Sequence, residues 1–380
     1  MTHLDRHMLA RGVLRHVLRS CLLAESLFAI ILAPAFAQPT RALWGYEPEP
    51  ASSPQEAIAT LQELGANAVF MNNVTPQLLQ ALRAANIKVF TSMNVFGDNS
   101  AWARYPQLRP VTSNGNLLAA KPGNGICPTQ RWYWPRILRS LQQKMDQGYD
   151  GVWLDFIRFS GHWEEAKPQL AHTCFCDSTL ADFSRFTGVV IPDDLEVREK
   201  TANGEETSTD ATPHASNAVK AAWILSHHRR EWRNYLTSVI ANFAARAKAQ
   251  MAAKPQLVLG AFVVPWQREE FGQAMLDYFG QDYRKLCEHI DIFSPMLYHE
   301  LCNRDTDWVA RFVDYTAAET RKPVLPIVQC DFGQEHRVTD DEFAGAILNA
   351  LDAPSQGVII FNYKALVEAR QMRILTSAWQ

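Results

Sequence analysis

The sequence lacks a surplus of charge of either sign. Its 380 residues include 37 Lys and Arg and 40 Asp and Glu, which gives a net charge of −3 at pH 7. A chain without a basic surplus has no electrostatic basis for binding nucleic acid, so we expect no nucleic-acid partner. With 47% hydrophobic and 20% charged residues, the composition is that of a soluble globular protein.

The N-terminal region lacks an apolar run long enough to span a bilayer. Its apolar stretch, Leu22–Ala35, is interrupted by Glu25 and Ser26 and follows a basic region that includes Arg15. Residues 35–37 read A-F-A, which is a signal-peptidase pattern with cleavage after Ala37. We therefore expect residues 1–37 to be a secretory signal peptide and the protein to be secreted or periplasmic. We expect no stable membrane insertion after cleavage, because a spanning helix needs about 20 apolar residues.

Metal-binding spacings are also absent. The sequence contains no C-x2-C, H-x-H or H-E-x-x-H pattern, and the pair Cys174 and Cys176 is separated by one residue only. Six cysteines remain beyond residue 37, and an even number in an oxidising compartment permits disulfides. We expect disulfides or free thiols rather than a metal site, and we expect no cofactor.

One stretch, Tyr149–Phe159, organises the rest of the chain. It reads Y-D-G-V-W-L-D-F-I-R-F, an apolar run that a single carboxylate, Asp155, interrupts. Such a run predicts a buried parallel strand, in which a charge is tolerated best at the C-terminal end. Active sites of parallel α/β folds are built there, so Asp155 and Arg158 are candidates for a pocket. The alternative is a structural salt bridge between the two side chains.

Strands and helices alternate along the whole chain. The expected strands are Ala42–Tyr46, Asn67–Met71, Ile87–Val95, Tyr149–Phe159, Gln256–Val264, Ile290–Tyr298, Pro323–Cys330 and Gly357–Tyr363. Eight βα units predict a (β/α)8 TIM barrel over residues 38–380, with an insertion at about 160–219 after strand four. An open doubly wound sheet is the alternative, but the first turn lacks a G-x-G-x-x-G motif.

Carboxylates and aromatic rings dominate the expected strand ends. These positions are Glu47, Asp98, Asp155, Trp266, Glu300, Asp331 and Tyr363. Glycoside hydrolysis needs two carboxyl groups, one as the acid and one as the nucleophile or base. Aromatic faces hold the apolar faces of sugars. The strand ends therefore indicate a carbohydrate-active hydrolase with a poly- or oligosaccharide substrate.

Four motifs in order resemble the signatures of glycoside-hydrolase-like TIM barrels. They are D-G-V-W-L-D-F-I-R-F at 150–159, S-P-M-L-Y at 294–298, P-I-V-Q-C-D-F at 326–332 and G-V-I-I-F-N-Y at 357–363. The resemblance implies a barrel and sugar chemistry. A more distant resemblance is to chitinases, whose D-G-x-D-x-D-x-E motif matches Asp150, Gly151 and Asp155 but has Ile157 at the acid position. Chitinase chemistry is therefore not expected.

These observations lead to assigned roles. We expect Asp155 to be the nucleophile or base, kept ionised by Arg158, and Glu300 or Asp331 to be the acid. The expected substrate-binding residues are Trp44, Glu47, Asp98, Arg158, Trp266, Tyr298, His299, Gln329 and Tyr363.

Two other functional classes remain open. A barrel that binds sugar without cleaving it is the better interpretation if Glu300 and Asp331 both point away from Asp155. A metal-dependent hydrolase or deacetylase would use Asp155, His162 and His299, although the sequence lacks the usual metal-binding patterns.

Overall fold

In the computed structural model of the protein, the described residues are 38–48, 52–195, 214–333, 336–352 and 354–379. The chain divides into two units, Met1–Pro39 and Thr40–Gln380, and the description below concerns the second. The predicted signal peptide at 1–37 and residues 196–213 of the predicted insertion lie outside the described residues.

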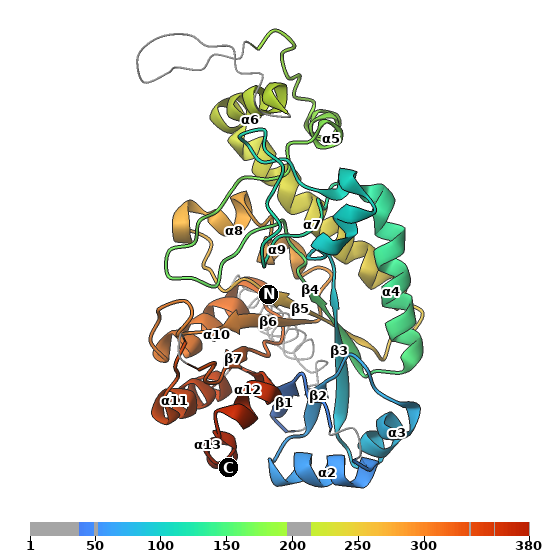
Figure 1. The fold of residues 1–380 in the computed structure, drawn as a ribbon, viewed down its shortest axis with the longest axis vertical. Coiled ribbons are helices and arrows are strands. Elements are labelled where there is room, and N and C mark those ends of the chain that lie inside the picture. Colours follow the sequence, from blue (N-terminus) through green and yellow to red (C-terminus); the bar gives the residue numbers. More distant parts are fainter. Residues whose placement is uncertain (1–37, 49–51, 196–213, 334–335, 353, 380) are drawn as a thin grey trace, which may run out of the picture. The chain divides into compact units, whose positions relative to one another are not determined.

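Eight parallel strands close into a barrel in sequence order (Figure 1). They are Thr40–Trp44 (β1), Ala68–Phe70 (β2), Lys88–Asn94 (β3), Gly151–Asp155 (β4), Val258–Val263 (β5), Ile292–Leu297 (β6), Ile327–Gln329 (β7) and Gly357–Phe361 (β8). β1 pairs with β8, which closes the cylinder. The predicted (β/α)8 barrel is therefore confirmed.

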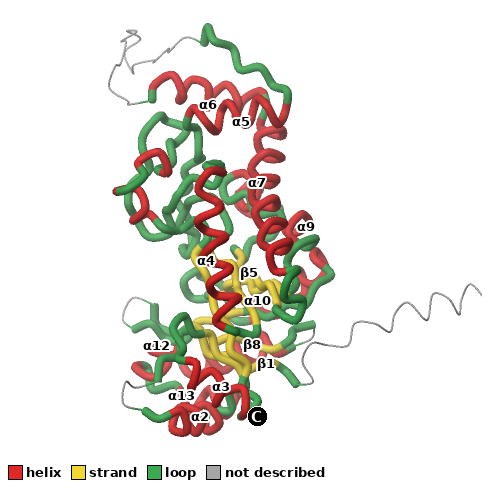
Figure 2. Tube along the Cα trace, turned by 90° about the vertical axis from the view of Figure 1, so that its right-hand side faces the viewer, coloured by secondary structure: helices red, strands yellow, loops and turns green. Residues whose placement is uncertain are grey.

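Helices surround the strands (Figure 2). They are Pro54–Glu63 (α2), Pro76–Ala84 (α3), Trp134–Gln147 (α4), Asp177–Thr187 (α5), Ala215–His227 (α6), Arg229–Met251 (α7), Ala274–Asp277 (α8), Tyr283–Leu286 (α9), Asp307–Thr320 (α10), Asp340–Leu351 (α11), Tyr363–Glu368 (α12) and Met372–Ala378 (α13). Capping boxes at Ser53 and Thr339 fix the starts of α2 and α11. No helix in the described ranges has both the length and the apolar character that crossing a membrane requires.

Two pairs of consecutive helices are separated by breaks at single residues. α6 and α7 are separated at His228, whose φ of −131° and ψ of 31° are not helical. α5 and α6 lie away from the strands and beside the N-terminal end of α7 (Figures 1 and 2). The C-terminal helix breaks between α12 and α13, where Arg370 adopts a left-handed φ of 60°. Hydrophobic periodicity continues across both breaks, so it does not reveal them.

Trp153 of β4 fills the inside of the barrel. Its side chain is fully buried, and its indole N–H donates to the Ser294 hydroxyl of β6 at 2.9 Å. Phe70 and Phe90 pack against the ring with centroid distances of 4.9 and 4.8 Å. A Cβ atom at Gly260 of β5 would lie only 2.1 Å from the indole, so this position has to be glycine. Asp155, two residues beyond Trp153, points to the same side of the strand and faces the mouth of the barrel.

The loops that follow β3 and β4 are bonded to each other above the C-terminal ends of the strands. The Ser160 hydroxyl accepts from the Gly125 N–H at 3.0 Å, and the Gly161 N–H donates to the Gly123 carbonyl at 3.2 Å. Further along, the Phe175 N–H donates to a carbonyl of the β3–α4 loop at 2.9 Å. The two loops therefore form one layer beside the mouth of the barrel.

Candidate active site

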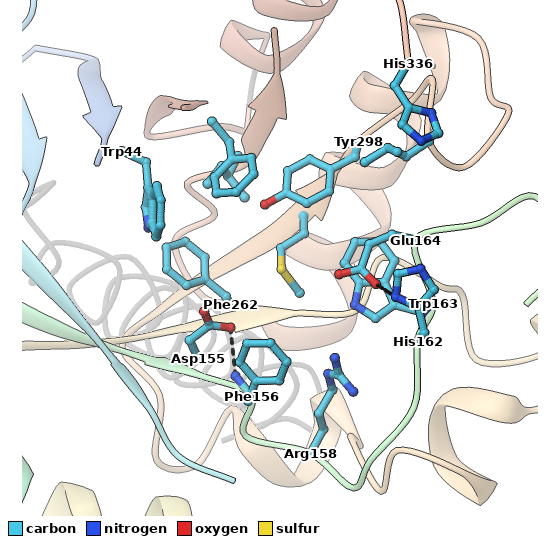
Figure 3. Close-up of a pocket in the computed structure, with 14 residues that line it drawn as sticks. Trp44, Asp155, Phe156, Arg158, His162, Trp163, Glu164, Phe262, Tyr298 and His336 are labelled. Atoms are coloured by element: carbon cyan, nitrogen blue, oxygen red, sulfur yellow. Dashed lines mark hydrogen bonds and ion pairs between the residues drawn. The ribbon is translucent and has the colours of Figure 1, made fainter. Parts of the chain in front are cut away.

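A cavity of about 450 Å³ opens at the C-terminal ends of the strands (Figure 3). Six of the eight strands supply side chains to it, from residues within the strands or just beyond their ends. These side chains are Trp44, Asp155, Phe262, Met296, Tyr298, Ile327 and Phe361. The β4–α5 loop supplies Phe156, Arg158, His162, Trp163 and Glu164, and the segments after β6 and β7 supply Leu301 and His336. The cavity therefore lies where barrel enzymes carry their chemistry.

Asp155 is the last residue of β4, and its carboxyl group faces this cavity. One carboxylate oxygen accepts from the N–H of the next residue, Phe156, at 2.8 Å. Burial raises the pKa of Asp155 to about 6, and the negative charge of Glu164 adds to the rise. The Phe156 N–H and the charge of Arg158 oppose the rise but do not cancel it. Asp155 is therefore poised to carry a proton in weakly acidic solution.

The backbone next to Asp155 is strained. Phe156 adopts a φ of 50°, in the left-handed region that bulky residues rarely occupy. Its ring lies where a Cβ atom at Gly97 would come within 2.5 Å, so Gly97 makes room for it. Strain of this kind persists where surrounding structure enforces it, and it clusters at functional sites.

Arg158 is buried beneath the cavity and is held by backbone carbonyls. Its guanidinium donates to the carbonyls of Phe159 at 3.2 Å and Gly161 at 2.7 Å. The group also lies over the rings of Phe156 and Phe279, at 4.9 and 5.0 Å from their centroids. Among the described residues it makes no direct ion pair with a carboxylate, so the salt bridge considered from the sequence is not formed. Its positive charge acts on the carboxyl groups of the cavity from a distance.

Glu164 supplies a second, partly buried carboxylate to the cavity, and it comes from the β4–α5 loop. Its Oε2 lies 2.9 Å from Nδ1 of His162 and also accepts from the Trp163 N–H at 3.2 Å. Burial alone would raise the pKa of Glu164, but the hydrogen bond from His162 and the charge of Arg158 outweigh it and lower the pKa. The same hydrogen bond raises the pKa of His162.

The pKa values of the two carboxyl groups in the cavity are thus shifted in opposite directions. Figure 3 shows Asp155 reaching the cavity from the strand and Glu164 reaching it from the loop. Burial raises the pKa of Asp155 despite the hydrogen bond from the Phe156 N–H, whereas the hydrogen bond from His162 and the charge of Arg158 outweigh burial and lower the pKa of Glu164. Environments that separate the pKa values of two nearby carboxyl groups mark acid and base roles.

Aromatic rings line one wall of the cavity in a row. Tyr298 stacks between Trp163 and Phe361, with centroid distances of 5.7 and 5.1 Å and interplanar angles of 21° and 25°. Trp44 continues the row, 4.8 Å from Phe361. Trp163 and Tyr298 are buried, whereas Trp44 and Phe361 are partly exposed. The exposed rings give the cavity an apolar face suited to sugar rings.

Of the residues expected at the site from the sequence, Asp155, Trp44, Arg158 and Tyr298 line the cavity. The two expected acids do not line it. Glu300 pairs with His336 at 3.1 Å, and only the histidine faces the cavity. Asp331 accepts from the N–H groups of Gly333 and Val338, at 2.9 and 3.3 Å, and lines a separate pocket. Backbone bonds in the loop after β7 turn the carboxyl group of Asp331 away from Asp155.

Three further expected residues lie outside the cavity lining because they hold other parts of the barrel together. Asp98 caps a short 3-10 helix, Asn99–Ala103, by accepting from the Ser100 N–H at 3.0 Å. Trp266 is buried against the ring of Phe279. Tyr363 packs edge-on against Tyr46 at 4.8 Å.

Glu47, His299 and Gln329 also lie outside the lining. Glu47 is exposed to solvent. His299 is buried, and burial lowers its pKa. Gln329 is buried at the end of β7, where its side-chain oxygen accepts from the Leu301 N–H at 3.2 Å. In the described part of the chain, Asp155, His162 and His299 do not form a group of metal ligands.

Sequence reasoning missed Glu164. Glu164 does not stand at a strand end but nine residues beyond Asp155, in an H-W-E-E segment. Catalytic residues of barrels also come from the βα loops. The signal that could have identified Glu164 is an acidic residue beside a tryptophan, in the loop that follows the strand predicted at Tyr149–Phe159.

Comparisons with known proteins give structural likeness without sequence likeness. No family model matches the chain, and no curated protein matches it. The glycoside hydrolase domain of PgaB (BpsB) from Bordetella bronchiseptica superimposes with a TM-score of 0.62 at 11% identity, covering 90% of this chain and 99% of that one. A β-galactosidase from the psychrophilic Marinomonas ef1 gives a TM-score of 0.62 at 11% identity, covering 90% of this chain.

A β-galactosidase from Rahnella sp. R3 gives a TM-score of 0.60 at 12% identity over 91% of this chain. The chain spans 59% and 56% of the lengths of the two β-galactosidases, so the likeness to them is to one part of each. At these identities the likeness is one of fold. The chain is a (β/α)8 barrel of the kind that these glycoside hydrolases contain.

Proposed function

We propose that the protein hydrolyses O-glycosidic bonds of a poly- or oligosaccharide with Asp155 and Glu164 as its pair of carboxyl groups. The observation that carries the proposal is that two carboxyl groups with pKa values shifted in opposite directions face one cavity with an aromatic wall. The fold likeness to glycoside hydrolase domains supports the same reaction class.

The pKa directions assign the roles. Asp155, with a pKa of about 6, is protonated in weakly acidic solution and donates its proton to the leaving-group oxygen. Glu164, with a lowered pKa, is ionised and either attacks the anomeric carbon or deprotonates the attacking water. This reverses the role expected for Asp155 from the sequence, because burial outweighs the charge of Arg158.

The aromatic row accounts for sugar binding. Trp44 and Phe361 are the partly exposed rings, and they lie on the β1 and β8 side of the cavity. Pyranose rings carry apolar C–H faces that pack on such side chains. A site of this kind suits an exported enzyme that acts on a polysaccharide outside the cytoplasm, and the N-terminal segment ending at Ala37 supports export.

The test uses a panel of polysaccharides and aryl glycosides with two variants and a control. Asp155→Asn should reduce hydrolysis of natural linkages by about 10²–10⁴-fold, the range of general acid catalysis. It should retain activity on dinitrophenyl glycosides, whose leaving group needs no proton. Glu164→Gln should lose activity on both substrates. Glu300→Gln, a carboxylate outside the cavity, should behave like the wild type.

A barrel that binds sugar without cleaving it is the competing function. The positions of Glu300 and Asp331 outside the cavity favour it, since neither can pair with Asp155. Glu164 favours hydrolysis, because it supplies the second carboxyl group. If the wild type binds a glycan of the panel but forms no product from any substrate in it, the binding function is established and hydrolysis is rejected.

A further inference from the structure

A cluster of three thiols lies in the layer of loops beside the mouth of the barrel. Cys127 comes from the β3–α4 loop, and Cys174 and Cys176 come from the β4–α5 loop just before α5. Their Sγ atoms all lie within 4.8 Å of one another. Cys127 and Cys174 are buried, and Cys176 is partly exposed. The fold therefore brings together residues whose sequence spacing gives no metal-binding pattern.

Hydrogen-bond donors surround Cys176. The Gln130 side-chain amide donates to its sulfur at 3.3 Å, and the hydroxyls of Thr179 and Ser178 lie 3.0 and 3.3 Å away. Cys176 also stands at the N-terminal cap of α5, where the helix dipole favours negative charge. A thiolate accepts these bonds much better than a thiol does, so the surroundings suit an ionised Cys176.

The other two sulfurs have their own polar neighbours. The Thr129 hydroxyl lies 2.9 Å from the sulfur of Cys127, and the Val111 backbone N–H donates to the sulfur of Cys174 at 3.3 Å. Hydrogen bonds of this kind are what the second shell of a thiolate–metal site contributes. All three sulfurs, and not only two of them, are therefore provided with polar partners.

A bound cation explains this arrangement best. Several thiolates gathered in a buried place repel one another unless a positive charge neutralises them. Three sulfur donors select thiophilic d¹⁰ ions such as Zn²⁺ and Cu⁺ over hard cations. A zinc ion with Zn–S bonds of ~2.3 Å holds its sulfurs roughly 3.8 Å apart. The observed limit of 4.8 Å leaves only small side-chain movements to complete such a site.

We propose that Cys127, Cys174 and Cys176 bind one thiophilic cation, Zn²⁺ or Cu⁺, which ties the β3–α4 loop to the β4–α5 loop. A disulfide is the competing use of the cluster, but it would join two of the sulfurs and leave the third unused. The cation instead uses all three, and it fastens the loop that also carries Glu164.

Metal analysis and cobalt spectroscopy test the site independently of any enzyme activity. The full chain is loaded separately with Zn²⁺ and with Cu⁺, freed of excess metal, and its metal content is measured. We expect about one equivalent in the wild type and in Cys287→Ser, a partly exposed thiol outside the cluster. Cys174→Ser and Cys176→Ser should lose it, and the metal that remains bound identifies the ion. If Cys174→Ser does not fold, Cys176→Ser, altered at the partly exposed position, provides the same test.

Co²⁺ added to the metal-free protein should give thiolate-to-metal absorption in the wild type and in Cys287→Ser, but not in Cys176→Ser. A chelator should lower the melting temperature of the wild type and of Cys287→Ser, but not that of Cys176→Ser. Stoichiometric metal binding that is unaffected by the cluster substitutions would overturn the proposal. Failure of both ions to bind, or a disulfide found among the three cysteines by alkylation of the unfolded, unreduced protein, would also overturn it.

Discussion

Replacing Asp155 by Asn should make the protein more stable at neutral pH while it removes the proposed acid. The fold holds this carboxyl group in a place that disfavours its charge, since burial raises its pKa to about 6. An unfolded aspartate has a pKa of about 3.9. Asparagine has no charge to bury, and its oxygen can still accept from the Phe156 N–H.

The magnitude follows from the shift. A rise of roughly two units, at 1.36 kcal/mol per unit, is about 3 kcal/mol of stability lost to ionisation. Part of the Asp155 side chain faces the open cavity, where water screens the charge, so we expect the variant to gain about 2 kcal/mol. The entropy of unfolding is about 2 cal/mol/K per residue, so a gain of about 2 kcal/mol raises the melting temperature of a domain of this length by roughly 3 °C.

The raised pKa of Asp155 sets the direction in which the stability difference between the variant and the wild type changes with pH. At pH 3 the carboxyl group is protonated in both states, so the variant and the wild type should be equally stable. Between about pH 4 and pH 6 the unfolded state loses its proton while the folded state keeps it, so the wild type loses stability as the pH rises. Above this window the difference should stay constant.

The assay is denaturant or thermal unfolding of both proteins from pH 3 to pH 8. Asp98→Asn serves as the matched control, because asparagine caps a helix as well as aspartate does and should change stability by a few tenths of a kcal/mol only. An Asp155→Asn variant no more stable than the wild type at pH 8 would refute the electrostatic reasoning. A stability difference that does not vary with pH would refute it equally.

Three further outcomes follow from the site and the core. The kcat/KM of the wild type should fall as the pH rises through about 6, since Asp155 must be protonated to act as the acid, and a pH–rate profile with its basic limb elsewhere would contradict that role. His162→Phe should raise the pKa of Glu164 by removing the hydrogen bond that lowers it, which would move the acidic limb of the profile upward. Trp153→Ala should lose about 3–5 kcal/mol of stability in denaturant unfolding, because it empties the centre of the barrel. A loss below 1 kcal/mol would mean that the neighbouring rings collapse into the space.

The barrel could be predicted from the sequence because each of its βα units has its own hydrophobic periodicity and its own turn residues. The apolar run within Tyr149–Phe159 is a local signal of this kind, and it is confirmed as β4. The breaks at His228 and Arg370 were not predictable, since each depends on the backbone angles of one residue.

The site was predictable only where the strand itself sets the direction of a side chain. Asp155 shares its side of β4 with Trp153, so its position follows from the alternation of the strand. Asp331 and Glu300 lie beyond their strands, where bonds to Gly333 and to His336 set their directions. Sequence alternation does not extend into such loops, and the same limit concealed Glu164.

Because Asp155 belongs to a barrel strand and Glu164 to a loop, the two halves of the site can change independently over evolution. Substitutions in β4 disturb the packing around Trp153 and its neighbours, so we expect the residues of this strand to change slowly. The loop after β4 contributes no residue to the barrel sheet, and insertions in such a loop are tolerated far more readily. A barrel that kept Asp155 and exchanged this loop could acquire a different partner carboxylate, and with it a different stereochemical course, without a change of fold.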